Sequence, residues 1–177
     1  MLPLIELSQE YDAVYNFFKA FDKQNHTVLA YVIMLNHLHL LLDYSGGKSL
    51  NTVIGNGRRF FAYEIINLLE QKEKAFLRKL QVEVKNKDRS CGKKHEVWIN
   101  SFDVKECRTE KFILQKLIYL HENPVNGKWK LCKSSLDYLH SSVDFYFNGK
   151  QKLFEVKDHR EFVKWEEMYE SWRRVPP

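Results

Sequence analysis

The segment that most constrains the fold is TVLAYVIMLNHLHLLLD, residues 27–43, in which almost every position is apolar. Side chains of a β-strand alternate between two faces, so a strand with this composition is apolar on both faces. Such a strand is typical of the centre of a sheet that is covered on each side. The segment therefore predicts one buried strand in a sheet against which helices pack.

Two histidines, His37 and His39, interrupt this apolar run. In a single strand they share one face, and the leucines at positions 38, 40 and 42 share the other. Burying two neutral imidazoles costs free energy unless each finds a polar partner, and a shared metal ion would provide one. The alternative is a pair of core histidines hydrogen-bonded to the backbone. The spacing alone is too short a pattern to decide between them.

Positive charge is concentrated in one part of the chain. The 177 residues suit one domain with a substantial core, and the formal net charge is +5. Residues 72–94 contain nine Lys or Arg and three Asp or Glu, so this segment alone exceeds the net charge of the chain. A run of this kind is either a solvated surface or a contact for nucleic acid.

The cysteine pattern and the length of the apolar runs indicate in which cellular compartment the protein is expected. Cys91, Cys107 and Cys132 are odd in number and form no C-x-x-C pair, which predicts a reduced protein without a disulfide framework or a zinc site. No uninterrupted apolar run is long enough to cross a membrane, and the first ten residues lack the features of a signal peptide. We therefore expect a cytoplasmic protein with no membrane partner.

Apolar residues at helical spacing predict four helices. Ser8 and Thr109 are the expected caps of the first and third helices, and Pro124 is expected to end the third. Gly55 and Gly57 weaken the first turns of the second. The expected helices cover residues 8–25, 50–69, 109–124 and 160–172, and a further strand is expected over residues 95–107.

The third predicted helix carries polar residues on one face. Tyr119 and Asn123 are four residues apart and project from the same side, and Lys116 joins them. A helical tyrosine is usually half-buried packing, and an asparagine before a proline is usually a capping or turn residue. Taken singly, each residue favours a structural role.

Three segments together resemble a known family. VIMLNHLHLLL, LIYLHENPVNGKW and SSLDYLHSS resemble motifs of the single-tyrosine transposases of small bacterial insertion sequences, most closely the REP-associated tyrosine transposases, which are HUH endonucleases. The resemblance covers about residues 25–142. It implies an α+β fold with a ferredoxin-like antiparallel sheet and packed helices over residues 1–142, and a C-terminal extension, residues 143–177, packed on the same domain.

By this resemblance each polar residue of the two motifs has a counterpart. Tyr119 matches the nucleophile, and His37, His39 and Asn123 match the ligands of a divalent cation, Mg²⁺ or Mn²⁺. His121 matches an intervening histidine, which we interpret as structural. The implied activity is metal-dependent nicking and strand transfer of single-stranded DNA, that is, DNA transposition through a 5′-phosphotyrosine intermediate.

The resemblance also implies partners and a location. The expected substrate is single-stranded DNA next to a hairpin, the expected location is cytoplasmic and nucleoid-associated, and a homodimer is left open. The residues expected to hold the DNA are Lys116, Arg58, Arg59, Lys93 and Lys94.

Two departures from the family keep alternatives open. Leu35 stands where the family commonly has a proline or small residue, and the chain begins almost at its first helix, where the family usually has a strand. We therefore expect a sheet that lacks an edge strand, and an unpaired edge favours pairing with another chain. The alternatives are a DNA-binding relic that no longer turns over and a phosphodiesterase that uses water in place of Tyr119.

Overall fold

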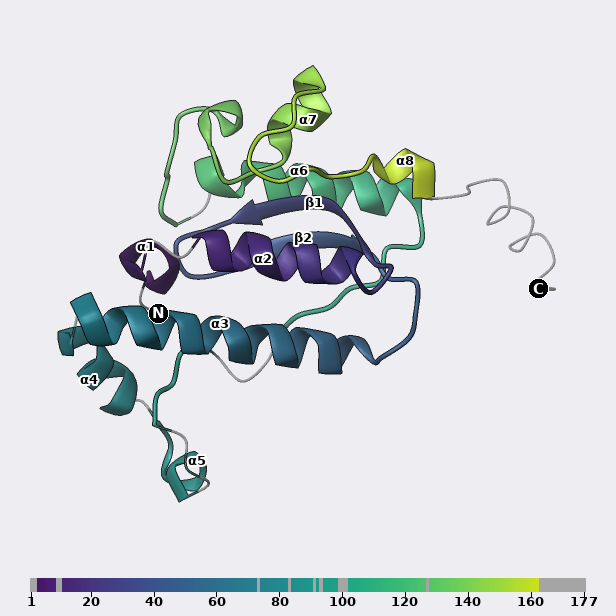
Figure 1. Ribbon diagram of the computed structural model, residues 1–177. Helices are drawn as coiled ribbons and strands as arrows, with labels where there is room; N and C mark the ends of the chain where they lie inside the picture. Colours follow the sequence, from purple (N-terminus) through teal and green to yellow (C-terminus); the bar gives the residue numbers. More distant parts are fainter. Residues whose placement is uncertain are drawn as a thin grey trace. The chain divides into compact units, whose positions relative to one another are not determined.

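The computed structural model describes residues 3–8, 11–72, 74–82, 84–90, 92, 94–98, 102–126 and 128–162. These residues form an α+β protein, which confirms the predicted class, and Figure 1 shows its helices and strands. The chain divides into two compact units. Unit 1 comprises Met1–Ala20, Leu35–His37 and Gly46–Lys105, and unit 2 comprises Phe21–Met34, Leu38–Ser45 and Glu106–Pro177.

The apolar segment forms a hairpin, so the prediction of one long strand was wrong. β1 (Thr27–Ile33) and β2 (Leu38–Asp43) pair antiparallel. A single strand over residues 27–43 would extend about 55 Å at about 3.3 Å per residue, whereas strands usually have 3 to 10 residues. Folding the segment back lets its two halves satisfy each other's backbone groups. His39 is therefore in a strand, while His37 lies in the connection before β2.

One face of the hairpin packs on a long helix, α6 (Glu110–Asn126), within unit 2. Val32 pairs with His39 and Ala30 pairs with Leu41, and directly paired residues point to the same side of a sheet. His39 and Leu41 thus lie on the α6 side, opposite the leucines at 38, 40 and 42, as the alternation of a strand predicts. The buried cluster on this side consists of Ala30, Val32, Met34, Ile113, Leu117 and Leu120.

The segment that follows α6 covers the outer edge of β1. This edge is therefore not unpaired, contrary to the expectation from the sequence. The Tyr138 hydroxyl donates to the Ile33 carbonyl (2.7 Å), and the Tyr146 hydroxyl donates to the Leu29 carbonyl (2.8 Å). Ser141 forms an isolated bridge with Val32. Elements in this covering segment are η1 (Ser135–Asp137), α7 (Val143–Asn148) and α8 (His159–Phe162).

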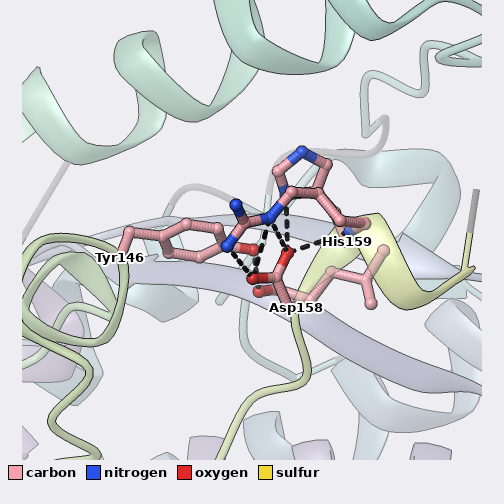
Figure 2. A network of polar contacts seen from close by, with 5 residues as sticks. Tyr146, Asp158 and His159 are labelled. Carbon is pink, nitrogen blue, oxygen red and sulfur yellow. Dashed lines mark hydrogen bonds and ion pairs between the residues drawn. The ribbon is translucent and has the colours of Figure 1, made fainter.

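Asp158 and its neighbours anchor the end of this segment (Figure 2). The Arg160 guanidinium donates to both Asp158 carboxylate oxygens, which lowers the pKa of Asp158. His159 is buried and its ring lies 5.8 Å from that of Tyr146. The remainder of the helix predicted over residues 160–172 lies outside the described residues.

Ser142 links β1 to α6 through one hydroxyl group. Its Oγ accepts from the Tyr31 backbone N–H (2.9 Å), lies 3.2 Å from the Tyr31 carbonyl oxygen and 3.0 Å from Nε2 of His121. All three residues are buried. Replacement of Ser142 by alanine would leave buried polar groups of both β1 and α6 without this partner.

We expect Ser142→Ala to lower the free energy of unfolding by about 1–3 kcal/mol, the cost of leaving a buried donor unsatisfied. Urea denaturation measures the change. The matched control is Ser134→Ala, since Ser134 is exposed and its hydroxyl accepts one long hydrogen bond of 3.4 Å from Leu136 N. Equal decreases in the free energy of unfolding for the two variants would contradict the role given to Ser142.

Unit 1 is a helical unit. Its elements are α1 (Leu4–Ser8), α2 (Tyr11–Asp22) as far as Ala20, α3 (Leu50–Lys72), α4 (Lys74–Val82) and α5 (Asn86–Ser90). α2 begins three residues later and ends three residues earlier than the helix predicted over residues 8–25. The Ile5 backbone N–H donates to the Leu35 carbonyl (2.9 Å), which ties the hairpin connection to α1. Buried side chains of the unit include Val14, Phe18, Phe61, Ile65, Leu69 and Leu80.

The strand predicted over residues 95–107 is wrong where the structure describes it, at residues 95–98 and 102–107. The Glu96 N–H donates to the Leu80 carbonyl (3.0 Å), and the Trp98 indole N–H donates to the Arg58 carbonyl (2.8 Å). The polar groups of this segment therefore bond to α3 and α4, and its aromatic side chain packs on Phe61 with ring centroids 5.2 Å apart. Contacts with helices replace the expected strand pairing.

Candidate active site

α6 is positioned by a cap at its start and an apolar face along its length. The Phe112 N–H donates to Oγ1 of Thr109 (3.3 Å), so Thr109 caps the helix as predicted. Ile113, Leu117 and Leu120 are buried against the sheet. The helix continues past Pro124 to Asn126, so the predicted end at Pro124 was wrong. The Leu131 N–H donates to the Pro124 carbonyl (2.7 Å), which satisfies an acceptor in the last turn.

Tyr119 and His39 meet at the margin between α6 and β2. Their ring centroids are 5.4 Å apart and the ring planes are inclined by 79°, an edge-to-face contact. Tyr119 is 57% exposed, so its ring is held by the imidazole while most of its surface remains open to solvent. Exposure of a large aromatic ring beside an imidazole leaves the phenol accessible to a ligand.

Lys116 places a positive charge beside Tyr119. Its Nζ lies 5.8 Å from the centroid of the Tyr119 ring and 4.9 Å from that of Phe112. The ammonium is thus held between two aromatic rings of the same helix face by cation–π attraction. Lys116 therefore places its ammonium over the face of the exposed Tyr119 ring.

Asn123 lies one turn beyond Tyr119 on α6. Its Nδ2 donates to the Tyr119 carbonyl (3.1 Å), which fixes the amide group against the helix. The carbonyl oxygen Oδ1 takes no part in this hydrogen bond. Amide oxygens of this kind are ligands for hard divalent cations.

The other predicted site residues belong to unit 1. His37 Nδ1 lies 2.7 Å from Oδ1 of its neighbour Asn36, and burial lowers the pKa of His37. The Arg58 guanidinium carbon lies 5.8 Å from the centroid of the Trp98 ring, and burial lowers the pKa of Arg58. Arg59 and Lys94 are exposed, and Lys93 lies outside the described residues. Unit 2 therefore brings together Tyr119, His39, Lys116 and Asn123.

The donor atoms of unit 2 fit a divalent cation in part. His39 offers an imidazole and Asn123 an amide oxygen, a mixed set suited to an ion that accepts both nitrogen and oxygen and keeps positions open. The described residues contain no group of three or more His, Cys, Asp or Glu side chains placed to hold a metal. Burial raises the pKa of the half-buried Cys107 thiol.

His121 has a structural environment on the opposite side of α6. It is buried, approaches Ser142 Oγ and lies 5.3 Å from the Tyr146 ring. These contacts agree with the structural role inferred from the sequence. Ser142 and Tyr146 had no local sequence signal, because their partners on β1 are 111 and 117 residues away.

Burial lowers the pKa of His121 to about 4 from its ordinary value near 6.5. Between about pH 4 and pH 6.5 the imidazole of His121 is therefore protonated in the unfolded chain and neutral in the folded protein. Stability from the neutral imidazole is complete above about pH 6.5 and decreases as the pH falls toward 4, by about 3 kcal/mol in all. Urea denaturation across this range measures the slope. We expect His121→Gln to flatten it, and an unchanged slope would contradict the assignment.

Comparisons with known proteins give no match. No protein-family model, no curated protein and no solved structure matches this chain. Among the helices of the described residues, none has the length and apolar character needed to cross a membrane.

Proposed function

We propose that this protein nicks single-stranded DNA and transfers the cut strand, as in DNA transposition, with Tyr119 as the nucleophile. The observation that carries the proposal is the exposed Tyr119 ring held edge-on by His39, with the Lys116 ammonium over its face. Tyrosine becomes a useful nucleophile when nearby positive charge stabilises its oxygen. The resemblance of the two motifs to single-tyrosine HUH transposases supports the same assignment.

In the proposed step a bond forms between Tyr119 Oη and the phosphorus of a DNA phosphodiester. The bond from phosphorus to the 3′ oxygen breaks, and the released oxygen takes a proton to become a free 3′-OH. The 5′ side of the break remains on the protein as a phosphotyrosine. Attack of a later DNA 3′-OH on that phosphotyrosine restores the phenol and joins the strands, so no oxidant or nucleotide cofactor is needed.

Each neighbour of Tyr119 has a distinct task in this proposal. His39 restrains the orientation of the phenol ring through its edge-to-face contact. Lys116 stabilises the charge on Oη as the hydroxyl loses its proton. His39 and Asn123 are the proposed ligands of Mg²⁺ or Mn²⁺ in unit 2, and the assignment of His37, which belongs to unit 1, rests on the sequence resemblance alone. When bound, such a cation supplies electrostatic stabilisation of the negative charge on the scissile phosphate.

DNA binding outside the reacting centre is proposed for the basic residues of unit 1. Arg59 and Lys94 are exposed there, and Arg58 lies against Trp98. Positive side chains of this kind neutralise phosphates without reading sequence. The proposed substrate remains single-stranded DNA beside a hairpin, and nucleoid association follows from the same contacts.

A covalent-adduct assay tests the proposal. The purified protein is incubated with labelled single-stranded oligonucleotides from the DNA flanking its own gene, in the presence of Mn²⁺ or EDTA, and separated on a denaturing gel. We expect a labelled protein band that requires the cation. Cleavage products without any adduct would support a phosphodiesterase that uses water. Binding without cleavage under every condition would support a non-catalytic relic.

A further inference from the structure

The basic side chains of unit 2 fall into two groups. Several are neutralised by a nearby carboxylate, as in the pairs Lys152–Asp144 (3.7 Å), Lys157–Glu155 (3.5 Å) and Arg160–Asp158 (2.5 Å). Three lysines of the loop that follows α6 form no ion pair with any described residue; these are Lys128, Lys130 and Lys133. All three are exposed. Their charge is therefore available to a ligand.

The loop holds these lysines outward because alternate residues point into the core. Trp129 and Leu131 pack against the buried cluster beneath α6, while Lys128 and Lys130 lie on the solvent side. The Lys128 ammonium lies 5.5 Å from the centroid of the Trp129 ring. The hydrogen bond from Leu131 N to the Pro124 carbonyl holds the loop against the last turn of α6. The lysines are thus presented by an anchored loop.

Two carboxylates lie near the loop, those of Glu122 and Asp137. Glu122 is half-buried and accepts hydrogen bonds from Asn126 Nδ2 (3.2 Å) and Ser135 Oγ (3.3 Å). Glu122 and Asp137 both contribute to raising the pKa of the partly buried Cys132 thiol. Of these two carboxylates, Glu122 is therefore half-buried and hydrogen-bonded, and Asp137 is exposed; the loop surface carries three exposed lysines against one exposed carboxylate.

The loop begins close to the candidate nucleophile. α6 ends at Asn126, seven residues beyond Tyr119, which is about 10 Å along the axis at about 1.5 Å per residue. At about 3.4 Å per nucleotide of a stacked strand, this distance corresponds to about three nucleotides.

We infer that Lys128, Lys130 and Lys133 bind the phosphate backbone of the single strand on one side of the position that Tyr119 attacks. This inference rests on the proposed function for the identity of the substrate, but its binding step requires neither the cation nor the phenol. The lysines act by charge and hold the strand in place. They do not read its sequence, because phosphate contacts carry no base information.

The test is the salt dependence of DNA binding. A labelled single-stranded oligonucleotide of mixed sequence is titrated in EDTA, and fluorescence anisotropy gives the affinity between about 50 and 200 mM salt. Each phosphate contact contributes about −0.7 to the slope of log K against log salt, so Lys128→Gln/Lys130→Gln/Lys133→Gln should make the slope less negative by about 2. The same three positions changed to arginine should retain the wild-type slope.

A charge-matched control separates this loop from general positive charge. Lys23→Gln/Lys111→Gln/Lys150→Gln removes the same charge from three exposed positions of unit 2 that likewise form no ion pair with any described residue, and should leave the slope unchanged. Equal changes in both triple variants would overturn the inference, as would a loop variant that binds like the wild type. Tighter binding of the wild type to a duplex than to the single strand would overturn the assigned ligand.

The adduct assay tests the reaction and the binding assay tests the loop, so either claim can be refuted without the other. If wild-type protein forms no adduct but the loop variant still loses affinity, the reaction is refuted and the binding surface stands. If the adduct forms and the loop variant binds like wild type, the reaction stands and the loop assignment is refuted.

Discussion

Replacement of Tyr119 by phenylalanine is expected to abolish the covalent adduct between this protein and single-stranded DNA. The substitution removes one oxygen atom and leaves the ring, so the edge-to-face contact with His39 and the cation–π contact with Lys116 remain. DNA binding should therefore persist while the adduct disappears. The measurement is the labelled protein band on a denaturing gel, with binding followed separately by anisotropy.

The matched control for this variant is Tyr63→Phe. Tyr63 lies on α3 and is 58% exposed, against 57% for Tyr119, so both substitutions remove an exposed phenol from a helix. We expect Tyr63→Phe to form the adduct at the wild-type level. An adduct that survives in Tyr119→Phe would show that another residue is the nucleophile. Cleavage by both variants without an adduct would favour attack by water.

The second large effect is expected at Gly57, where two helices of unit 1 approach closely. A Cβ atom built at Gly57 would lie 2.0 Å from Cε2 of Phe17, a distance that real Cβ atoms do not show. Gly57→Ala should therefore displace the half-buried Phe17 ring, at a cost of about 1–3 kcal/mol in the free energy of unfolding. The better helix propensity of alanine, up to about 1 kcal/mol, offsets only part of this loss.

Gly55 is the natural control because it lies in the same helix and faces open space. Apart from its chain neighbours and the adjacent backbone of α3, no heavy atom lies within 4 Å of a Cβ built at this position. Gly55→Ala should raise the free energy of unfolding by about 0.5–1 kcal/mol, since glycine inside a helix is destabilising by that amount relative to alanine. Urea denaturation should thus show effects of opposite sign. An equal gain for both variants would mean that Phe17 rotates away without cost.

The start of α6 could be predicted from local sequence, whereas Ser8, the expected cap of the first predicted helix, is the last residue of α1, and α6 does not end at Pro124. Thr109 caps α6 as predicted, and the apolar spacing that predicted this helix identifies the same residues that pack on the sheet, Ile113, Leu117 and Leu120. The early glycines of α3 suggested only a weakened helix. The structure explains why position 57 is a glycine, because the missing side chain leaves room for the Phe17 ring. The partner of a glycine cannot be read from its neighbours in sequence.

The candidate site was predictable only in its residue types. The alternation of a strand correctly placed His39 opposite the neighbouring leucines, and helical spacing correctly placed Lys116, Tyr119 and Asn123 together. Periodicity could not show that residues 34–37 reverse the chain, so His37 was assigned to a strand in which it does not lie. Strand pairing is a non-local choice, and one apolar run can satisfy its backbone groups with another segment or with itself.

By itself, the sequence determined the α+β class, the apolar face of α6 and the chemistry of the side chains at Tyr119. These follow from local backbone preferences and from the period of the apolar residues, which act over a few positions. Only the tertiary structure decided that His39 meets Tyr119, that Ser142 bonds to Tyr31 and that the segment after α6 covers β1. Those contacts join residues 80 to 117 positions apart. Their free energies depend on which surfaces are buried together, and that choice is made by the whole fold.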